Sequence, residues 1–297
     1  MIKDLIDKGG EVNLFTRPRR FGKSLGISML QYFFDNLKKD DSDIFDGLHI
    51  SRAGEQYLAH QNKYPVIKLT LKEASSDNFD DSFKKLINEI SSEFKRHKYV
   101  LTNGTLESSE KDKYQRIIDE TAVDTDYSLS LKFLSECLEK YYNEKVIILI
   151  DEYDVPLEKS YFSGYYDKMV NFIRAFFGGA LKTNDSLKFA VITGCLRVSK
   201  ESIFTGINNL NIVSILSDSF GEYFGFTEPE IDGMLKHYDL EHKTDEMQDW
   251  YNGYLFGETV VYNPWSSIKY LLTLFMGKWN FQSLIGQIQA QIASFAN

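Results

Sequence analysis

Gly22, Lys23 and Ser24 have the residue types and the spacing that bind phosphate. They end the segment TRPRRFGKS, which follows a short apolar run and precedes residues with helical periodicity. The three residues match the second half of the pattern G-x-x-x-x-G-K-[ST], in which backbone N–H groups at a helix start surround phosphate oxygens. In such a loop the lysine reaches the β- and γ-phosphates, and the hydroxyl holds Mg²⁺. The segment therefore predicts a phosphate site.

The first half of this loop departs from the pattern. Arg17 stands where the first glycine falls, and Pro18 has no N–H to donate. We expect the phosphate-binding N–H groups to come from residues 20–24. Four cations, at positions 17, 19, 20 and 23, lie within seven residues of an acidic chain and would match a polyanion. The alternative is a basic turn on a solvated surface. The candidate nucleotide-binding residues are Arg19, Arg20, Phe21, Gly22, Lys23 and Ser24.

A second group of polar residues follows an apolar run in VIILIDEYD. The run is typical of a strand that is covered on both faces, and Asp151 and Glu152 stand at its carboxyl end. Asp151 can hold Mg²⁺ through water opposite Ser24, and Glu152 can polarise an attacking water as a general base. The alternative is that acids commonly end buried strands simply to meet solvent. The phosphate loop about 130 residues upstream makes that interpretation the weaker one.

The segment VITGCLR places a third group at the end of another predicted strand. Thr193 would stand beside the γ-phosphate and orient the water, and Arg197 or Lys200 would stabilise the developing charge. A threonine followed by glycine is also a common way for a strand to end without any role in chemistry. The candidate catalytic residues are Glu152, Thr193 and Arg197, and the candidate metal ligands are Ser24 and Asp151.

These groups need a parallel sheet to bring them together. Apolar runs predict strands at residues 11–15, 64–71, 146–150, 187–192 and 211–216. Helical periodicity predicts helices between them, for example from Ser24 onward and over residues 79–94, and the first nine residues have the pattern of a helix end. Strands that alternate with helices indicate a doubly wound α/β sheet.

Two segments differ from this alternation. Residues 103–128 are polar and charged, so we expect a surface excursion or a mobile helical hairpin that buries little apolar surface. Beyond residue 220 the pattern changes, with a capping box at Thr227 and Glu230 and a final helix that opens at Asn263. We expect a sheet domain over residues 1–220 and a small, mainly helical unit over residues 221–297.

The composition excludes several classes of protein. Of the 297 residues, 43% are hydrophobic, which excludes a disordered chain. The net charge of −9 argues against general coating of nucleic acid, though not against a local basic site. No secretory signal or membrane span is visible. Cys137 and Cys195 are far apart, and the five histidines lack zinc-ligand spacing. We therefore expect neither disulfides nor zinc, and a cytoplasmic location.

The chain resembles bacterial AAA-ATPase-like proteins, often fused to a PD-(D/E)XK nuclease-like domain, in TRPRRFGKS, LIDEYD, TGCLRVSKESIFTGINNL, FGFTEPEI and WYNGYLFG…VYNPWS. The resemblance runs from about residue 1 to 272. Its loop is similar to the GPRRxGK[ST] version of archaeal-type ATPases, within the P-loop class that has an extra strand and a catalytic glutamate. The resemblance implies the strand order 5-1-4-3-2. It also implies Walker A roles for Lys23 and Ser24, Walker B roles for Asp151 and Glu152, and the sensor position for Thr193.

The chain departs from this family in three ways. It starts just after the point where a YVDKT-like motif usually ends a preceding segment. Leu255 stands where the family often has arginine, and the tail after about Gly277 has no E-x-K nuclease pattern. We therefore expect the nuclease half to be absent, and we predict no DNA cleavage by this chain.

Three functions stay open at this point. The first is Mg²⁺-dependent binding and hydrolysis of ATP by a protein of the AAA-like P-loop class. The second is a module that holds a nucleotide or a nucleic-acid phosphate without turnover. A small-molecule kinase is the weakest, because Asp-Glu after the strand favours activation of water over a substrate hydroxyl. ATP and Mg²⁺ are the expected cofactors. The family context allows a nucleic-acid or protein partner and an oligomer, and we expect no membrane partner.

Overall fold

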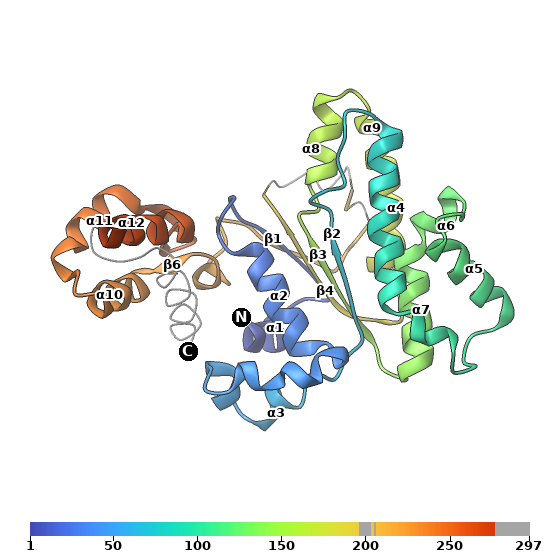
Figure 1. The fold of residues 1–297 in the computed structure, drawn as a ribbon, viewed down its shortest axis with the longest axis horizontal. Coiled ribbons are helices and arrows are strands. Elements are labelled where there is room, and N and C mark those ends of the chain that lie inside the picture. The colour runs from blue at the N-terminus through green and yellow to red at the C-terminus, as the bar shows by residue number, and fades with distance from the viewer. Residues whose placement is uncertain (196–202, 205, 277–297) are drawn as a thin grey trace.

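The computed structural model describes residues 1–195, 203–204 and 206–276 of the chain (Figure 1). Its centre, within these ranges, is a parallel sheet of five strands in the spatial order β2-β3-β4-β1-β5. The strands are β1 (Val12–Thr16), β2 (Val66–Thr70), β3 (Val146–Asp151), β4 (Leu187–Gly194) and β5 (Leu210–Val213). Read from the opposite edge, the order is 5-1-4-3-2, as the family resemblance implied. Each of the five predicted strands is present.

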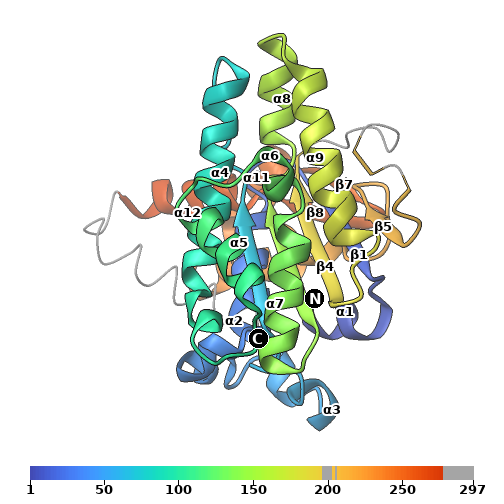
Figure 2. The ribbon, with the colours of Figure 1, turned by 90° about the vertical axis from the view of Figure 1, so that its right-hand side faces the viewer.

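Helices cover both faces of this sheet (Figures 1 and 2). One face carries α4 (Phe79–Arg96), α5 (Ser108–Ile118), α6 (Asp124–Ser128), α7 (Ser130–Tyr142), α8 (Val155–Phe162) and α9 (Tyr166–Leu181), with the 3₁₀ helix η3 (Lys98–Leu101) after α4. The other carries α1 (Ile2–Lys8), α2 (Lys23–Phe34) and α3 (Glu55–Leu58), with the 3₁₀ helices η1 (Asn36–Phe45) and η2 (His49–Arg52).

The side chains of β3 show how the two faces are filled. Ile148 and Ile150 pack in the cluster that contains α4–α9, whereas Ile147 and Leu149 pack in the cluster that contains α1 and α2. All four are fully buried, as expected for a parallel strand with helices on both sides. The predicted doubly wound α/β arrangement is confirmed.

Strand β4 lies between β1 and β3. This order determines which segments lie close together at the carboxyl edge of the sheet. Phe15 on β1 pairs with Thr193 on β4, and Ile150 on β3 pairs with Ile192 on β4. The loop after β1, the end of β4 and Asp151 at the end of β3 therefore leave the sheet at the same level. The sheet brings together three segments that are far apart in the sequence.

Residues 103–128 contain the helices α5 and α6, which agrees with the helical part of the predicted hairpin. The expectation that these residues bury little apolar surface is wrong. Tyr114 and Ile117 on α5 and Tyr127 on α6 are at most 1% exposed and join the core cluster with α4. The Tyr114 hydroxyl also donates to the carbonyl of Phe94 at 2.9 Å. A few apolar residues suffice because Tyr114 and Ile117, three positions apart, lie on one face of their helix.

The described segment from residue 221 to residue 276 is mostly helical and also contains a sheet that the sequence did not lead us to expect. Its helices are η4 (Gly221–Tyr223), α10 (Glu228–His237), η5 (Glu241–Lys243), α11 (Thr244–Tyr251) and α12 (Pro264–Met276). The antiparallel strands β6 (Phe226–Thr227), β8 (Thr259–Tyr262) and β7 (Asn252–Phe256) lie in that spatial order. Thr227 and Glu230 form the predicted capping box. The boundary at residue 220 stays a prediction, since Phe224 and Phe256 pack in the same cluster as Phe15 of β1.

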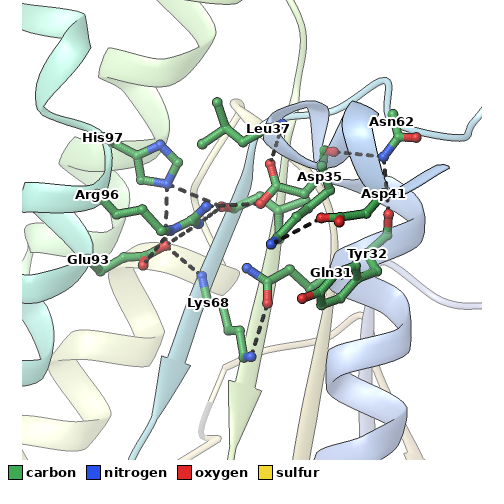
Figure 3. A network of polar contacts seen from close by, with 12 residues as sticks. Gln31, Tyr32, Asp35, Leu37, Asp41, Asn62, Lys68, Glu93, Arg96 and His97 are labelled. Atoms are coloured by element: carbon green, nitrogen blue, oxygen red, sulfur yellow. Dashed lines mark hydrogen bonds and ion pairs between the residues drawn. The ribbon is translucent and has the colours of Figure 1, made fainter. Parts of the chain in front are cut away.

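Partly buried ion pairs fix the far end of α2, the helix that begins at the predicted phosphate loop (Figure 3). Asp35, which follows α2, accepts a bond of 2.9 Å from Nη1 of Arg96 at the end of α4. Two other nitrogens of Arg96 donate to Glu93 at 2.6 and 2.9 Å. The Glu93 carboxylate also accepts the backbone N–H of Lys68 on β2 at 2.8 Å. The network therefore joins α2, β2 and α4 at one edge of the sheet.

Charge pairing decides the protonation of Glu93. Burial alone would raise the pKa of this carboxyl group, but hydrogen bonds from His97 and Arg96 outweigh burial and lower it to about 2. A carboxylate with a lowered pKa in the folded state stabilises the fold above its ordinary pKa of 4.5. This contribution is lost as the pH falls from about 4.5 towards 2.

We expect Glu93→Gln to lower the free energy of unfolding at pH 7 by about 1–3 kcal/mol, because the partly buried Arg96 then loses a charged acceptor. The measurement is urea unfolding of both proteins between pH 3 and pH 7. The difference between them should shrink as the pH falls below 4.5. Glu55→Gln, on the exposed first turn of α3, is the control and should change stability by less than about 0.5 kcal/mol. A difference that stays constant with pH would contradict the assignment of the lowered pKa to Glu93.

Candidate functional site

The loop between β1 and α2 has a backbone suited to binding an anion. Arg20 and Gly22 have left-handed conformations, with φ of 70° and 79°. Such turns let successive N–H groups point towards one centre. Helix α2 begins directly after Gly22, with no side-chain cap and no acidic residue in its first turn. The N–H groups of that turn have no acceptor within the helix, and the helix dipole favours negative charge there.

The Lys23 side chain closes this loop from inside. Its ammonium group donates to the backbone carbonyls of Arg17 and Pro18, both at 3.0 Å, and to Sγ of Cys195 at 3.2 Å. Lys23 is only 5% exposed. The cation is therefore held between the start of the loop and the residue that follows β4.

Asp151 brings two predicted site residues together. Its Oδ2 accepts a hydrogen bond of 2.5 Å from the Ser24 hydroxyl, and its Oδ1 accepts a hydrogen bond from the Thr193 hydroxyl. Asp151 and Thr193 are buried, whereas Ser24 is exposed. The loop, the end of β3 and the end of β4 thus meet at one carboxylate. Thr193 turns its hydroxyl towards Asp151, so the geometry makes it a residue that orients this carboxylate.

The donor set at this carboxylate fits Mg²⁺ and does not fit zinc. Ser24 and Asp151 offer a hydroxyl and a carboxylate oxygen, which are ligand types that Mg²⁺ prefers, and it commonly takes its other ligands from water and phosphate. Among the residues that the structure describes, no group of three or more His, Cys, Asp or Glu side chains could hold a metal ion. A metal at this site would therefore take the rest of its coordination from water and the nucleotide.

Glu152 stands next to this centre in a strained conformation. Its φ is 53°, which is uncommon for a residue with a side chain and is often found at functional sites. Burial, and then the neighbouring charge of Asp151, raise the pKa of the Glu152 carboxyl group above its ordinary value. A raised pKa makes a carboxylate a better proton acceptor. The environment suits the predicted role of general base.

Arg17 corrects the prediction that four cations of the loop face a polyanion. Its side chain is fully buried and lies away from the loop, where its guanidinium donates to the carbonyls of Val213 at 2.8 Å and Phe220 at 3.4 Å. The rings of Phe224 and Phe256 lie 5.1 and 4.9 Å from it. Burial lowers the pKa of Arg17 to about 10, so the side chain still carries its charge at neutral pH. Arg17 therefore joins the end of β5 to Phe220, Phe224 and Phe256.

Three further residues of the loop, Arg19, Arg20 and Phe21, have different surroundings. Arg19 is exposed and pairs with Glu158 on α8 at 3.5 Å. The guanidinium of Arg20 lies 5.2 Å from the ring centre of Trp265. Phe21 is 1% exposed and packs on Tyr254, with 4.7 Å between ring centres, so only its backbone is placed to bind a ligand. Arg197 and Lys200, the predicted charge stabilisers, lie outside the described residues.

The segment LIDEYD makes hydrogen bonds to the end of β4 that the sequence did not predict. The backbone N–H of Tyr153 donates to the carbonyl of Thr193 at 3.0 Å, and the Asp154 carboxylate accepts the N–H of Cys195 at 2.9 Å. Gly194 must be glycine, because a Cβ there would lie 2.5 Å from the Tyr153 ring. The glycine directly after Thr193 was the available signal for this close approach. These contacts fix the turn that carries Glu152 against the end of β4.

Strand β1, the predicted phosphate loop and helix α2 follow one another in the chain. Asp151 ends β3, which lies two strands from β1 in the sheet, and its carboxylate accepts the Ser24 hydroxyl. These features define a P-loop NTPase-like α/β protein. The family model described as "AAA-ATPase_like: Predicted AAA-ATPase" matches residues 1–204, and the chain belongs to this family.

The chain is also similar to a curated protein of unknown role. It is 25% identical over 272 residues to the "Uncharacterized protein in vnfD 5'region" of Azotobacter chroococcum mcd 1. The alignment covers 91% of this chain and 46% of that protein, so the chain spans about half of its relative's length. No solved structure matches the chain. In the described part of the chain, no helix has both the length and the apolar character needed to cross a membrane.

Proposed function

We propose that this protein binds ATP together with Mg²⁺ at the loop between β1 and α2, and hydrolyses it. One contact carries the proposal: the hydroxyl that follows Lys23 donates to Asp151 at 2.5 Å, across 127 residues of sequence. Membership of the predicted AAA-ATPase family supports a nucleotide as the ligand. The bound Mg²⁺ would neutralise charge on the β- and γ-phosphates.

Lys23 and the start of α2 would bind the phosphates. The Lys23 ammonium exchanges its two carbonyl acceptors, on Arg17 and Pro18, for phosphate oxygens, which are charged and therefore stronger acceptors. The free N–H groups of the first turn of α2 bind the same phosphates. Ser24 and Asp151 would hold the metal, Asp151 through a water, and Thr193 keeps the Asp151 carboxylate in its orientation.

Glu152 would accept a proton from the water that attacks the γ-phosphate. Its raised pKa and its place directly after Asp151 suit this role. Arg197 stays our candidate for the cation that stabilises charge in the transition state, as in other enzymes that transfer phosphoryl groups. A protein that binds ATP at this loop but never hydrolyses it would be the binding module that we considered as the second function.

Lys23→Ala tests the phosphate site. We expect ATP in the presence of Mg²⁺ to bind about 10–100 times more weakly, because a charge-assisted hydrogen bond is removed. Isothermal titration calorimetry measures the affinity. Lys84→Ala, at an exposed position on α4, is the control and should bind ATP as the wild type does. Equal affinity in Lys23→Ala and Lys84→Ala would contradict the assignment of this loop.

A further inference from the structure

An exposed tryptophan lies against the phosphate loop, although it comes about 245 residues after it. Trp265 is 56% exposed and is the second residue of α12. Its ring centre lies 5.2 Å from the Arg20 guanidinium. The neighbouring Asn263 donates from Nδ2 to the carbonyl of Arg19 at 3.5 Å. The start of α12 therefore contacts two consecutive residues of the loop.

The backbone that carries Trp265 is held in place. The side chain of Asn263 accepts the N–H of Ser266 at 3.1 Å, and the Asn263 carbonyl accepts the N–H of Ser267 at 3.0 Å. Pro264 restricts the backbone of the first helical position. The tryptophan therefore stands on a capped helix start, and more than half of its surface is exposed.

Two more exposed apolar side chains lie at this loop. Tyr254 is 42% exposed and packs edge-on against Phe21, and Leu25 is 67% exposed on the first turn of α2. Phosphate binding uses backbone N–H groups, Lys23 and Ser24, and it gives no reason for apolar surface. The apolar part of a nucleotide is its base, whose flat faces can stack on an aromatic ring, and the ribose links that base to the phosphates.

We propose that Trp265 is the surface on which the base of the bound nucleotide stacks. The inference rests on the proposed binding of ATP at this loop. Stacking on an aromatic ring tolerates any base, and loss of the ring weakens binding about tenfold or more per base. The Arg20 guanidinium contacts the same ring. The proposed base site therefore lies next to the loop that binds the phosphates.

The test compares two ligands that differ in the base. Calorimetry measures the affinity of ATP and of inorganic tripolyphosphate, each with Mg²⁺, for the wild type and for Trp265→Ala, Trp265→Phe and Trp250→Ala. Trp250 is the matched control, since it is 76% exposed on α11. We expect Trp265→Ala to bind ATP about tenfold more weakly or worse and to bind tripolyphosphate as the wild type does. Trp265→Phe should keep most of the affinity for ATP, and Trp250→Ala should keep all of it.

Three outcomes would overturn the assignment of Trp265. If Trp265→Ala binds ATP as tightly as the wild type, the ring does not contact the base. If its affinities for ATP and tripolyphosphate fall equally, the ring supports the loop through Arg20 and has no role with the base. If the wild type binds neither ligand, the phosphate site itself is wrong. The last result differs from the other two, because it refutes the proposed function as well.

Discussion

A Glu152→Gln variant should bind ATP as tightly as the wild type and hydrolyse it about 10²–10⁴ times more slowly. Glutamine keeps the size and polarity of the side chain but cannot accept the proton of the attacking water. The unusual φ of 53° at this position is a property of the backbone, which the substitution leaves unchanged. Release of inorganic phosphate measures turnover, and calorimetry measures binding.

Glu73→Gln is the matched control for this variant. Glu73 is exposed and follows β2, the strand beside β3, at the same edge of the sheet. This control should hydrolyse ATP at the wild-type rate. Because burial and Asp151 raise the pKa of Glu152, the wild-type rate should also fall on acidification at a pH above 4.5. If Glu152→Gln and the wild type hydrolyse ATP equally fast, Glu152 is not the general base. If neither hydrolyses ATP but both bind it, the protein is a binding module.

The sequence predicted the residues whose roles depend on local pattern. Lys23 and Ser24 follow a loop glycine, and Asp151 ends an apolar run, so each was recognisable within a few residues. The meeting of Ser24 and Thr193 at the Asp151 carboxylate follows from the strand order, which the family resemblance supplied. In the structure this order places β4, with Thr193 at its end, between the other two segments.

Features that depend on which way a side chain points could not be predicted from the sequence. A count of cations in the loop cannot distinguish Arg20, which is exposed, from Arg17, which is fully buried. The contact between Arg20 and Trp265 could not be predicted from local sequence either, because it joins residues about 245 positions apart.

One missed element did have a local signal. Strands β7 and β8 are joined by Gly257 and Glu258 alone, and Gly257 has a φ of 57°. Two-residue connections with positive φ are typical of β-hairpins. Apolar residues on both sides of this pair, in YLFGETVVY, could therefore have predicted the hairpin in a segment that we expected to be mainly helical.

Arg17→Ala should lower the free energy of unfolding by about 3–5 kcal/mol. The guanidinium donates to three carbonyls, those of Thr16, Val213 and Phe220, and no part of the residue is exposed. Alanine would remove the side-chain donor from these carbonyls and would open a cavity between the rings of Phe224 and Phe256. Since these contacts join β1 and β5 to Phe220, Phe224 and Phe256, their loss should weaken the packing of those three residues against the sheet. Urea unfolding of the wild type and the variant measures the change.

Arg19→Ala is the matched control, two positions along the same loop. Its side chain is 75% exposed and pairs only loosely with Glu158, so its removal should cost at most about 1 kcal/mol. Arg17→Lys should fall between the wild type and Arg17→Ala, because an ammonium group keeps the charge but cannot reach all three carbonyls in the geometry of a guanidinium. One result would contradict this role: Arg17→Ala as stable as Arg19→Ala, but with weaker binding of ATP. Arg17 would then be a phosphate ligand, as the prediction of four cations facing a polyanion requires.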